Sequence, residues 1–226
     1  MNEQHWTRSD VARAWVPRAQ SQAEELANSV SHGAGLLAAI AATPYLISQV
    51  VIHSDTSYVV GTGVFAVTMI LLYLSSTLYH TLPPGKNKRV FRTIEHAAIF
   101  LLIAGTYTPL ALGVVPGASG TILLALIWGL AAIGVTLKLS NRLNHPIASV
   151  GLYLFMGWLI LIAIDPLYSH LGTEGMFWLV SGGIAYTVGV AFFATDSRLL
   201  FGHFIWHLFV MLGSGCHYLA VLALAS

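Results

Sequence analysis

Charged residues are scarce in this chain, where Asp, Glu, Lys and Arg together make up 8% of 226 residues. Soluble domains carry about 25% charged residues, so this composition excludes a fold whose whole surface faces water. Hydrophobic residues account for 56% of the chain. The balance favours an all-α integral membrane protein whose helices form one domain.

Other features are also missing. The single Cys216 excludes an internal disulfide framework and a metal–thiolate cluster. No basic patch of the nucleic-acid-binding kind is present, so we expect no nucleic-acid partner. A secretory signal peptide is not recognisable either, because a polar stretch precedes the first apolar run. We therefore expect residues 1–24 to be retained as a cytoplasmic segment, either a short helix on the membrane surface or a disordered tail, and residues 25–226 to form the membrane domain.

Long apolar runs are what the chain has in quantity. Seven runs of about 20 residues are each predicted to be a transmembrane helix, because backbone groups in lipid must be satisfied within the segment. They cover roughly residues 33–52, 57–78, 97–115, 120–139, 146–164, 176–193 and 204–225. Short loops are predicted between them, among them DPLYSHLGTEG at 165–175. The predicted fold is a seven-transmembrane helix bundle.

The ten Lys and Arg residues follow a one-sided distribution along these runs. All of them precede the first run or lie between the second and third, fourth and fifth, or sixth and seventh. By the positive-inside rule, the N-terminus is predicted in the cytoplasm and the C-terminus outside.

Rare polar side chains reach one predicted depth near the cytoplasmic face. Ser76 and His80 end the second run, Glu95 opens the third, and His203 and His207 open the seventh in GHFIWHLFV. Such groups are costly inside a membrane and tend to face the bundle interior. A further set precedes the first run near the same face: Glu25, Asn28 and His32.

The types of these residues indicate a zinc site. His203 and His207 are one helical turn apart, and His80 supplies a third imidazole from another helix. Three protein ligands leave one tetrahedral position open, which is typical of catalytic zinc. Glu95 could then orient a zinc-activated water or take its proton, and Ser76 could hydrogen-bond that water or a developing oxyanion.

Each residue also has a simpler interpretation on its own. Glu95 could stabilise the start of a helix, and Ser76 could bond its own helix backbone. A single histidine at a helix end is commonly interfacial, as expected for His53, His145 and His170. His217 lies too far along its helix to share the inner site. Only the conjunction of ligand types at one depth favours a metal.

Four segments carry a resemblance to a known family: ELANSVSHGAG, SSTLYHTL, IEHAAIFLLIAGTYTP and GHFIWHLFVMLGSGCHY. From about Glu25 to Tyr218 the chain resembles the bacterial haemolysin III proteins. These belong to the progestin and adipoQ receptor family and to the wider superfamily of alkaline ceramidases.

This resemblance implies a multi-pass protein of the bacterial inner (plasma) membrane with a zinc ion on its cytoplasmic side. The family's histidine ligands fall on His80, His203 and His207, and its serine on Ser76. Glu95 stands where the family has a water-binding aspartate; glutamate keeps the charge but adds a methylene, so its carboxylate could bind the metal directly or displace the water. Glu25, Asn28 and His32 match a further motif, for which helix–helix hydrogen bonding is expected.

Four classes of function are compatible with these features. The first is a zinc-dependent intramembrane hydrolase that acts on a lipid amide or ester, with membrane lipid as partner and possible substrate. The second is a non-catalytic sensor or regulator of membrane state in which zinc is structural. A cytolysin, the historical name of the family, and an ion or proton transporter are less well supported by the sequence. The oligomeric state is left open.

Overall fold

The structure, a computed structural model, describes residues 18–143 and 145–225. Within these residues it contains α-helices and one short 3-10 helix, and no strand. The elements are α2 (Gln22–His53), α3 (Thr56–Thr81), α4 (Lys86–Gly113), α5 (Gly117–Leu139), α6 (Pro146–Trp158), η1 (Leu159–Ala163), α7 (Ile164–Thr195) and α8 (Gly202–Ala223). The all-α prediction is therefore confirmed. The predicted N-terminal segment falls mostly on residues 1–17, outside the described residues, and α2 already begins at Gln22, before the predicted boundary at residue 25.

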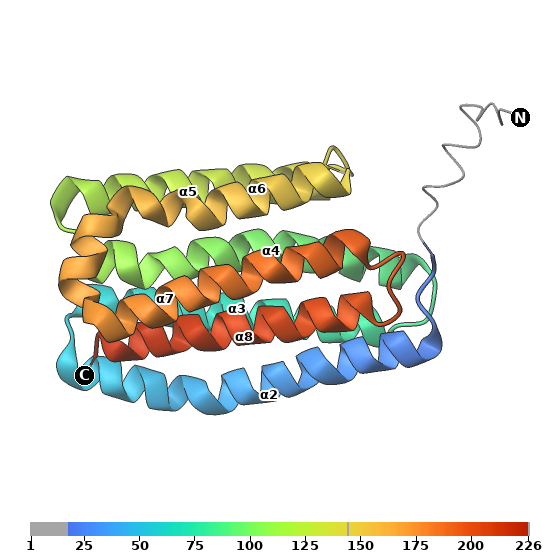
Figure 1. Ribbon diagram of the computed structural model, residues 1–226, viewed down its shortest axis with the longest axis horizontal. Coiled ribbons are helices and arrows are strands. Elements are labelled where there is room, and N and C mark those ends of the chain that lie inside the picture. Colours follow the sequence, from blue (N-terminus) through green and yellow to red (C-terminus); the bar gives the residue numbers. More distant parts are fainter. Residues whose placement is uncertain (1–17, 144, 226) are drawn as a thin grey trace, which may run out of the picture.

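The helices lie along one common axis and the chain reverses at each end of the molecule (Figure 1). The start of α2, the end of α3, the starts of α4 and α8 and the end of α7 all meet at one end. Helices α5 and α6 lie together along one side of the molecule, with α4 and α7 beside them (Figure 1). Segments far apart in sequence are thus collected at the end where α2 begins.

Local sequence explains where the first two helices begin. Ser21 and Glu24 form a capping box, in which each side chain receives a hydrogen bond from the other residue's backbone N–H. The Asp55 side chain accepts a hydrogen bond from the backbone N–H of Tyr58 at the start of α3. Gly61 then lets α3 approach α4, because a Cβ there would lie 2.6 Å from Pro109 Cα.

Within residues 18–143 and 145–225, six helical segments are long and apolar enough to cross a membrane. One of them is the run Ala148–Thr195, whose 48 residues would extend about 72 Å as a single helix. This exceeds twice the roughly 30 Å of a bilayer core. Figure 1 shows the chain turning back between α6 and α7. The predicted count of seven crossings is not established by these criteria and stays a prediction.

The prediction of a loop at residues 165–175 is wrong. Helix α7 already begins at Ile164, and its backbone departs from helical geometry only at Gly172, with φ 60° and ψ −170°. Pro166 does not prevent the helix, because a proline in the first turn removes no helical hydrogen bond. Gly172 takes a positive φ that residues with a Cβ adopt rarely. The basic stretch at residues 86–92, predicted between runs, likewise forms the first turns of α4.

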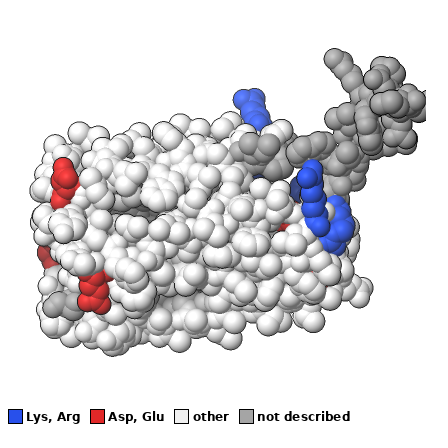
Figure 2. Space-filling view, viewed as in Figure 1, with Lys and Arg blue, Asp and Glu red and all other residues white. Residues whose placement is uncertain are grey.

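Charged side chains gather at the two ends of the molecule. On the face drawn in Figure 2, Lys and Arg side chains lie at the end where α2 begins, with a small acidic patch beside them. Acidic side chains lie at the opposite end, and the surface between the two ends is uncharged on this face. A surface of this kind is matched to a bilayer, whose hydrocarbon core excludes charge while both interfaces admit it.

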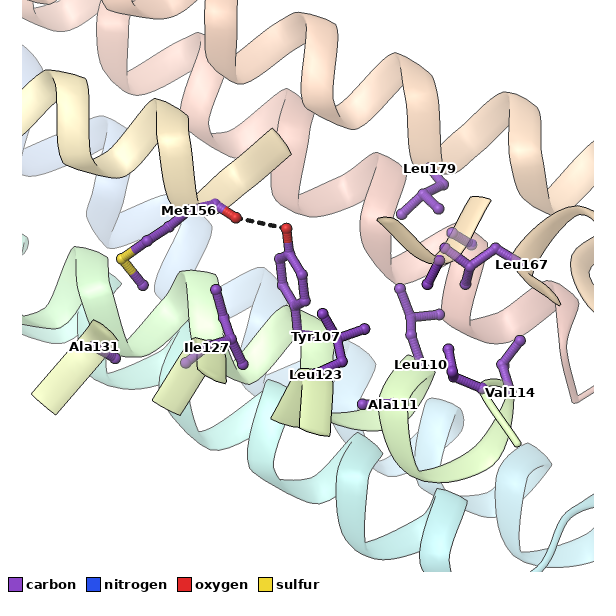
Figure 3. Close-up of a cluster of buried hydrophobic side chains, with 14 of the residues drawn as sticks. Tyr107, Leu110, Ala111, Val114, Leu123, Ile127, Ala131, Met156, Leu167 and Leu179 are labelled. Atoms are coloured by element: carbon purple, nitrogen blue, oxygen red, sulfur yellow. Dashed lines mark hydrogen bonds between the residues drawn. The ribbon is translucent and has the colours of Figure 1, made fainter. Parts of the chain in front are cut away.

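The apolar interior has two main clusters. One joins α4 to α5, α6 and α7 through buried side chains such as Phe100, Ile127, Met156 and Leu167 (Figure 3). The other joins α2, α3, α4 and α8, and includes Leu46, Phe65 and Val210. The polar site described next lies at the basic end of the second cluster.

Candidate metal centre

Four potential ligands from three helices meet at the basic end of the bundle. His80 comes from the last turn of α3, Glu95 from the N-terminal half of α4, and His203 and His207 from the start of α8. One nitrogen or oxygen of each residue lies within 4.8 Å of those of the other three. Their exposed fractions are 3%, 5%, 8% and 1% in the same order. The structure therefore brings together the three predicted ligands and the predicted carboxylate.

The donor atoms fit a metal ion. His80 Nε2, His203 Nε2 and Glu95 Oε2 are buried and have no hydrogen-bond partner among the described residues. Unpaired buried polar atoms are rare, and several converging on one point indicate a missing common partner. Ligand atoms around tetrahedral zinc stand roughly 3.3 Å apart, and the four candidate ligand atoms already lie within 4.8 Å of one another.

Each imidazole of His80, His203 and His207 is oriented by a hydrogen-bond acceptor at its Nδ1. His80 Nδ1 lies 2.8 Å from Glu25 Oε2, and His203 Nδ1 lies 3.0 Å from Asp196 Oδ2. Ionised carboxylates only accept hydrogen bonds, so each Nδ1 carries the proton and each Nε2 presents its lone pair. This arrangement of carboxylate, histidine and metal is common in zinc sites, where it sets the tautomer and raises the basicity of the ligand.

Helix α2 supplies much of this outer layer. Glu25 is held between His80 and Lys88, whose Nζ lies 3.0 Å from Glu25 Oε2. His207 Nδ1 donates to the backbone carbonyl of Asn28 at 3.2 Å. Sequence reasoning expected Glu25 and Asn28 to make helix–helix hydrogen bonds, but it did not assign them to the metal ligands. Their common depth with His80 was the available signal.

Ser76 lies beside the cluster, fully buried, one helical turn from His80. Its Oγ lies 2.7 Å from Nδ1 of His32, a histidine on α2. The ring of His32 stacks on His207 with 3.5 Å between centroids and 4° between planes. The Ser76 hydroxyl is thus hydrogen-bonded to His32. The predicted hydrogen bond from Ser76 to a water or an oxyanion stays a prediction.

A polar clasp, formed by the hydrogen bonds of Glu24 with Arg18 and Phe201, lies at the same end of the bundle as the cluster. Arg18 Nη2 lies 2.6 Å from Glu24 Oε1, and the backbone N–H of Phe201 donates to the same oxygen at 2.9 Å. The hydrogen bond to Glu24 raises the pKa of the Arg18 guanidinium, so this side chain keeps its charge. The clasp ties the start of α2 to the segment that carries Asp196 and His203.

Two neighbouring cavities lie near the candidate metal centre, and only the smaller is lined by residues of the cluster. The smaller, of about 20 Å³, is lined by Glu95, His203 and His32 among others, and can hold about one water. The larger, of about 130 Å³, runs between α4, α6, α7 and α8 and has almost wholly apolar walls. Four residues line both cavities: Leu72, Ile99, Trp206 and Val210. A small cavity that several polar side chains reach thus lies next to a larger, almost wholly apolar one.

Together these features define a multi-pass helical membrane protein with a buried histidine–carboxylate cluster near its basic end. Comparison with known proteins makes the class specific. Residues 20–218 match the model of the haemolysin-III related family, and the chain belongs to this family.

Its similarity to individual relatives extends over most of their length. Hemolysin-3 of Bacillus cereus is 45% identical over 199 residues, which cover 88% of this chain and 90% of the relative. The Hemolysin-3 homolog of Bacillus subtilis (strain 168) is 42% identical over 199 residues, covering 88% and 93%. The monocyte to macrophage differentiation factor of Homo sapiens is 28% identical over 207 residues, covering 88% and 83%.

Proposed function

We propose that this protein is a zinc-dependent hydrolase that cleaves an amide or ester bond of a membrane lipid. His80, His203 and His207 would hold the zinc, with the Glu95 carboxylate beside them. When bound, zinc supplies Lewis-acid activation of a carbonyl group and of water. Glu95 Oε2, which has no partner among the described residues, is placed to take a proton from the attacking water.

The observation that carries this proposal is the contact between the two cavities. The larger cavity offers apolar walls to an acyl chain, and the smaller offers His203, Glu95 and His32 to a polar head. A lipid with its chain among α4, α6, α7 and α8 would place the bond next to its headgroup at the cluster. A structural zinc site has no need of such a neighbour.

The proposed topology has seven crossings, with the N-terminus in the cytoplasm and the C-terminus outside. Helix α6 has 13 residues and η1 has 5, and together they extend close to the roughly 30 Å of a bilayer core. The basic end would face the cytoplasm by the positive-inside rule, which puts the metal centre at the inner leaflet of the bacterial plasma membrane. Reporter fusions after Ser140, beyond the end of α5, and at the break in α7 near Gly172 test the crossing count.

Turnover of lipids by the purified, zinc-loaded protein tests the proposed activity. A panel of ceramides, other N-acyl amides, phospholipids and glycerides should reveal at least one substrate whose hydrolysis stops in His207→Ala. His170→Ala is the matched control, because His170 is exposed on α7 and should leave turnover unchanged. No hydrolysis across the panel by zinc-loaded protein would reject the proposal.

A second candidate function is a regulator of membrane state with a structural zinc. One observation favours it: Glu95 lies within the same 4.8 Å group as the three histidines, so four protein ligands could close the coordination sphere. The zinc affinity of Glu95→Gln separates the candidates. In a hydrolase the three histidines should still hold zinc while turnover stops, whereas a structural site with four protein ligands should lose zinc affinity.

The two remaining hypotheses fit the structure less well. A cytolysin, as the names of the Bacillus relatives suggest, would not need a metal centre buried inside a bundle. A transporter would need polar groups along its path, but the cavity that leads away from the cluster has apolar walls. We therefore propose neither.

A further inference from the structure

His32 on α2 lines the smaller cavity, whereas Ser76 on α3 does not. His32 lines the smaller cavity together with Glu95 and His203. Ser76 is not among the described residues that line this cavity, although its neighbour one turn away, Leu72, is. The polar group that faces the pocket from this side is therefore an imidazole, with the serine hydroxyl behind it.

The His32 ring is held firmly on several sides. Ser76 Oγ contacts Nδ1 at 2.7 Å, and the face of the ring stacks on His207 at 3.5 Å. The ring of Tyr73 packs edge-on at 5.1 Å and 63°. A side chain fixed in this way has little freedom left to lose when it contacts a ligand, as expected of a preorganised polar group.

The remaining nitrogen of this ring has no partner. His32 Nε2 is buried and makes no hydrogen bond to any described residue, while the residue as a whole is 2% exposed. A buried donor without an acceptor is costly, so the ring nitrogen requires either a water or a ligand atom in the adjoining cavity. It is not part of the group of four that lies within metal-ligand distance.

From this geometry we infer that His32 is a substrate-contacting residue and that Ser76 is the positioning residue behind it. The Ser76 hydroxyl donates to Nδ1, which leaves the proton on Nε2. That N–H donates to the carbonyl oxygen of the lipid ester or amide that lies against the metal centre. A carbonyl oxygen is the acceptor that esters and amides share, and its negative charge grows during hydrolysis. The inference rests on the proposed function and deepens it.

Four variants separate this arrangement from a purely structural role. His32→Phe keeps a ring to stack on His207 but removes both nitrogens, and His32→Gln restores an amide N–H near the position of Nε2. Ser76→Ala removes the hydroxyl behind the ring. The double variant of His32→Phe and Ser76→Ala reports whether the two residues act through each other.

Binding of a long-chain acyl hydroxamate to the zinc-loaded protein, measured by calorimetry, provides the test without requiring turnover. We expect His32→Phe and Ser76→Ala each to weaken binding about 10-fold, which is the size of one lost hydrogen bond to a buried group. The double variant should be no weaker than His32→Phe, and His32→Gln should recover part of the loss. In competition with a chelator, all four should retain zinc within about 3-fold of wild type, since neither residue is a ligand.

Three outcomes would overturn the inference. Hydroxamate binding by His32→Phe at wild-type strength would show that the ring acts only by packing. A double variant weakened about 100-fold would show that Ser76 contacts the ligand independently. Absence of hydroxamate binding and lipid turnover in the wild type would reject the proposed function together with this inference, whereas either of the first two results rejects this inference alone.

Discussion

The two sides of the bundle are held together by different interactions. Around the metal centre, α2, α3 and α8 are joined by buried polar contacts such as His80 to Glu25 and His207 to the carbonyl of Asn28. Along α5, α6 and the neighbouring parts of α4 and α7, the contacts are mainly apolar, and the larger cavity lies among them. Polar contacts are directional and fix atoms in place, whereas apolar packing tolerates a guest of variable shape. The comparison shows one side with fixed polar groups, as the proposed metal site requires, and another with a mainly apolar interior, as the proposed acyl chain requires.

The largest effect is expected on the polar side, where removing a proposed ligand should lower the metal affinity. His207→Ala deletes one of three imidazoles, and we expect metal affinity to fall by at least about 100-fold, beyond what the loss of an outer-layer contact causes. Elemental analysis measures the metal content of the purified variant. His53→Ala, at the opposite end of α2, is the control. Equal metal content in both variants would disprove the assignment of His207.

Weakening the outer layer should have the next largest effect. Glu25→Gln keeps the shape of the side chain but loses the charge that faces His80 and Lys88. We expect metal affinity to fall by about 10- to 100-fold, measured by chelator competition. Glu174→Gln, an exposed residue on α7, serves as the control. If both variants bound zinc as the wild type does, helix α2 would have no part in the site.

The contact between α3 and α4 links the two sides and tolerates no additional atoms. In Gly61→Ala the new Cβ would lie 2.6 Å from the backbone of Pro109, whereas Gly63 on the same helix has no atom within 4 Å of that position. We expect Gly61→Ala to lower the free energy of unfolding by about 1–3 kcal/mol and Gly63→Ala to leave it equal or higher. Chemical unfolding in detergent distinguishes them, and equal stabilities would contradict the close packing of α3 on α4.

The smallest effect is expected on the apolar side. The Tyr107 hydroxyl donates to the carbonyl of Met156 at 2.6 Å, which joins α4 to the end of α6 (Figure 3). Tyr107→Phe should lower the free energy of unfolding by about 1 kcal/mol and leave zinc affinity unchanged, because the bond is remote from the cluster. Tyr168→Phe, at an exposed position, is the control. A change in zinc affinity would show that the two sides are coupled.

The clustering of His80, Glu95, His203 and His207 could be predicted from sequence because it depends on local spacing and depth. His203 and His207 share a helix face by their separation alone, and His80 and Glu95 reach the same depth because the helices that carry them end or begin there. The outer layer could not be predicted in the same way. The contact of His80 with Glu25 depends on how α2 rotates against α3, which packing decides and spacing does not.

The division between α6 and α7 shows a second limit. The residues DPLYSHLGTEG have the composition of a loop, yet most of them form helix, because proline is tolerated in a first turn and a single glycine provides the break. Composition therefore located the change of direction but not its geometry. His32 illustrates a third limit: its partner Ser76 lies on another helix, and only the structure places the imidazole between the hydroxyl and the pocket.

X-ray absorption at the zinc edge of the purified protein tests the central proposition most directly. We predict one zinc per chain, surrounded by three imidazole nitrogens and oxygen at about 2.0–2.1 Å. Absence of a stoichiometric metal, or a coordination shell without imidazole, would contradict the assignment of this cluster as a metal centre.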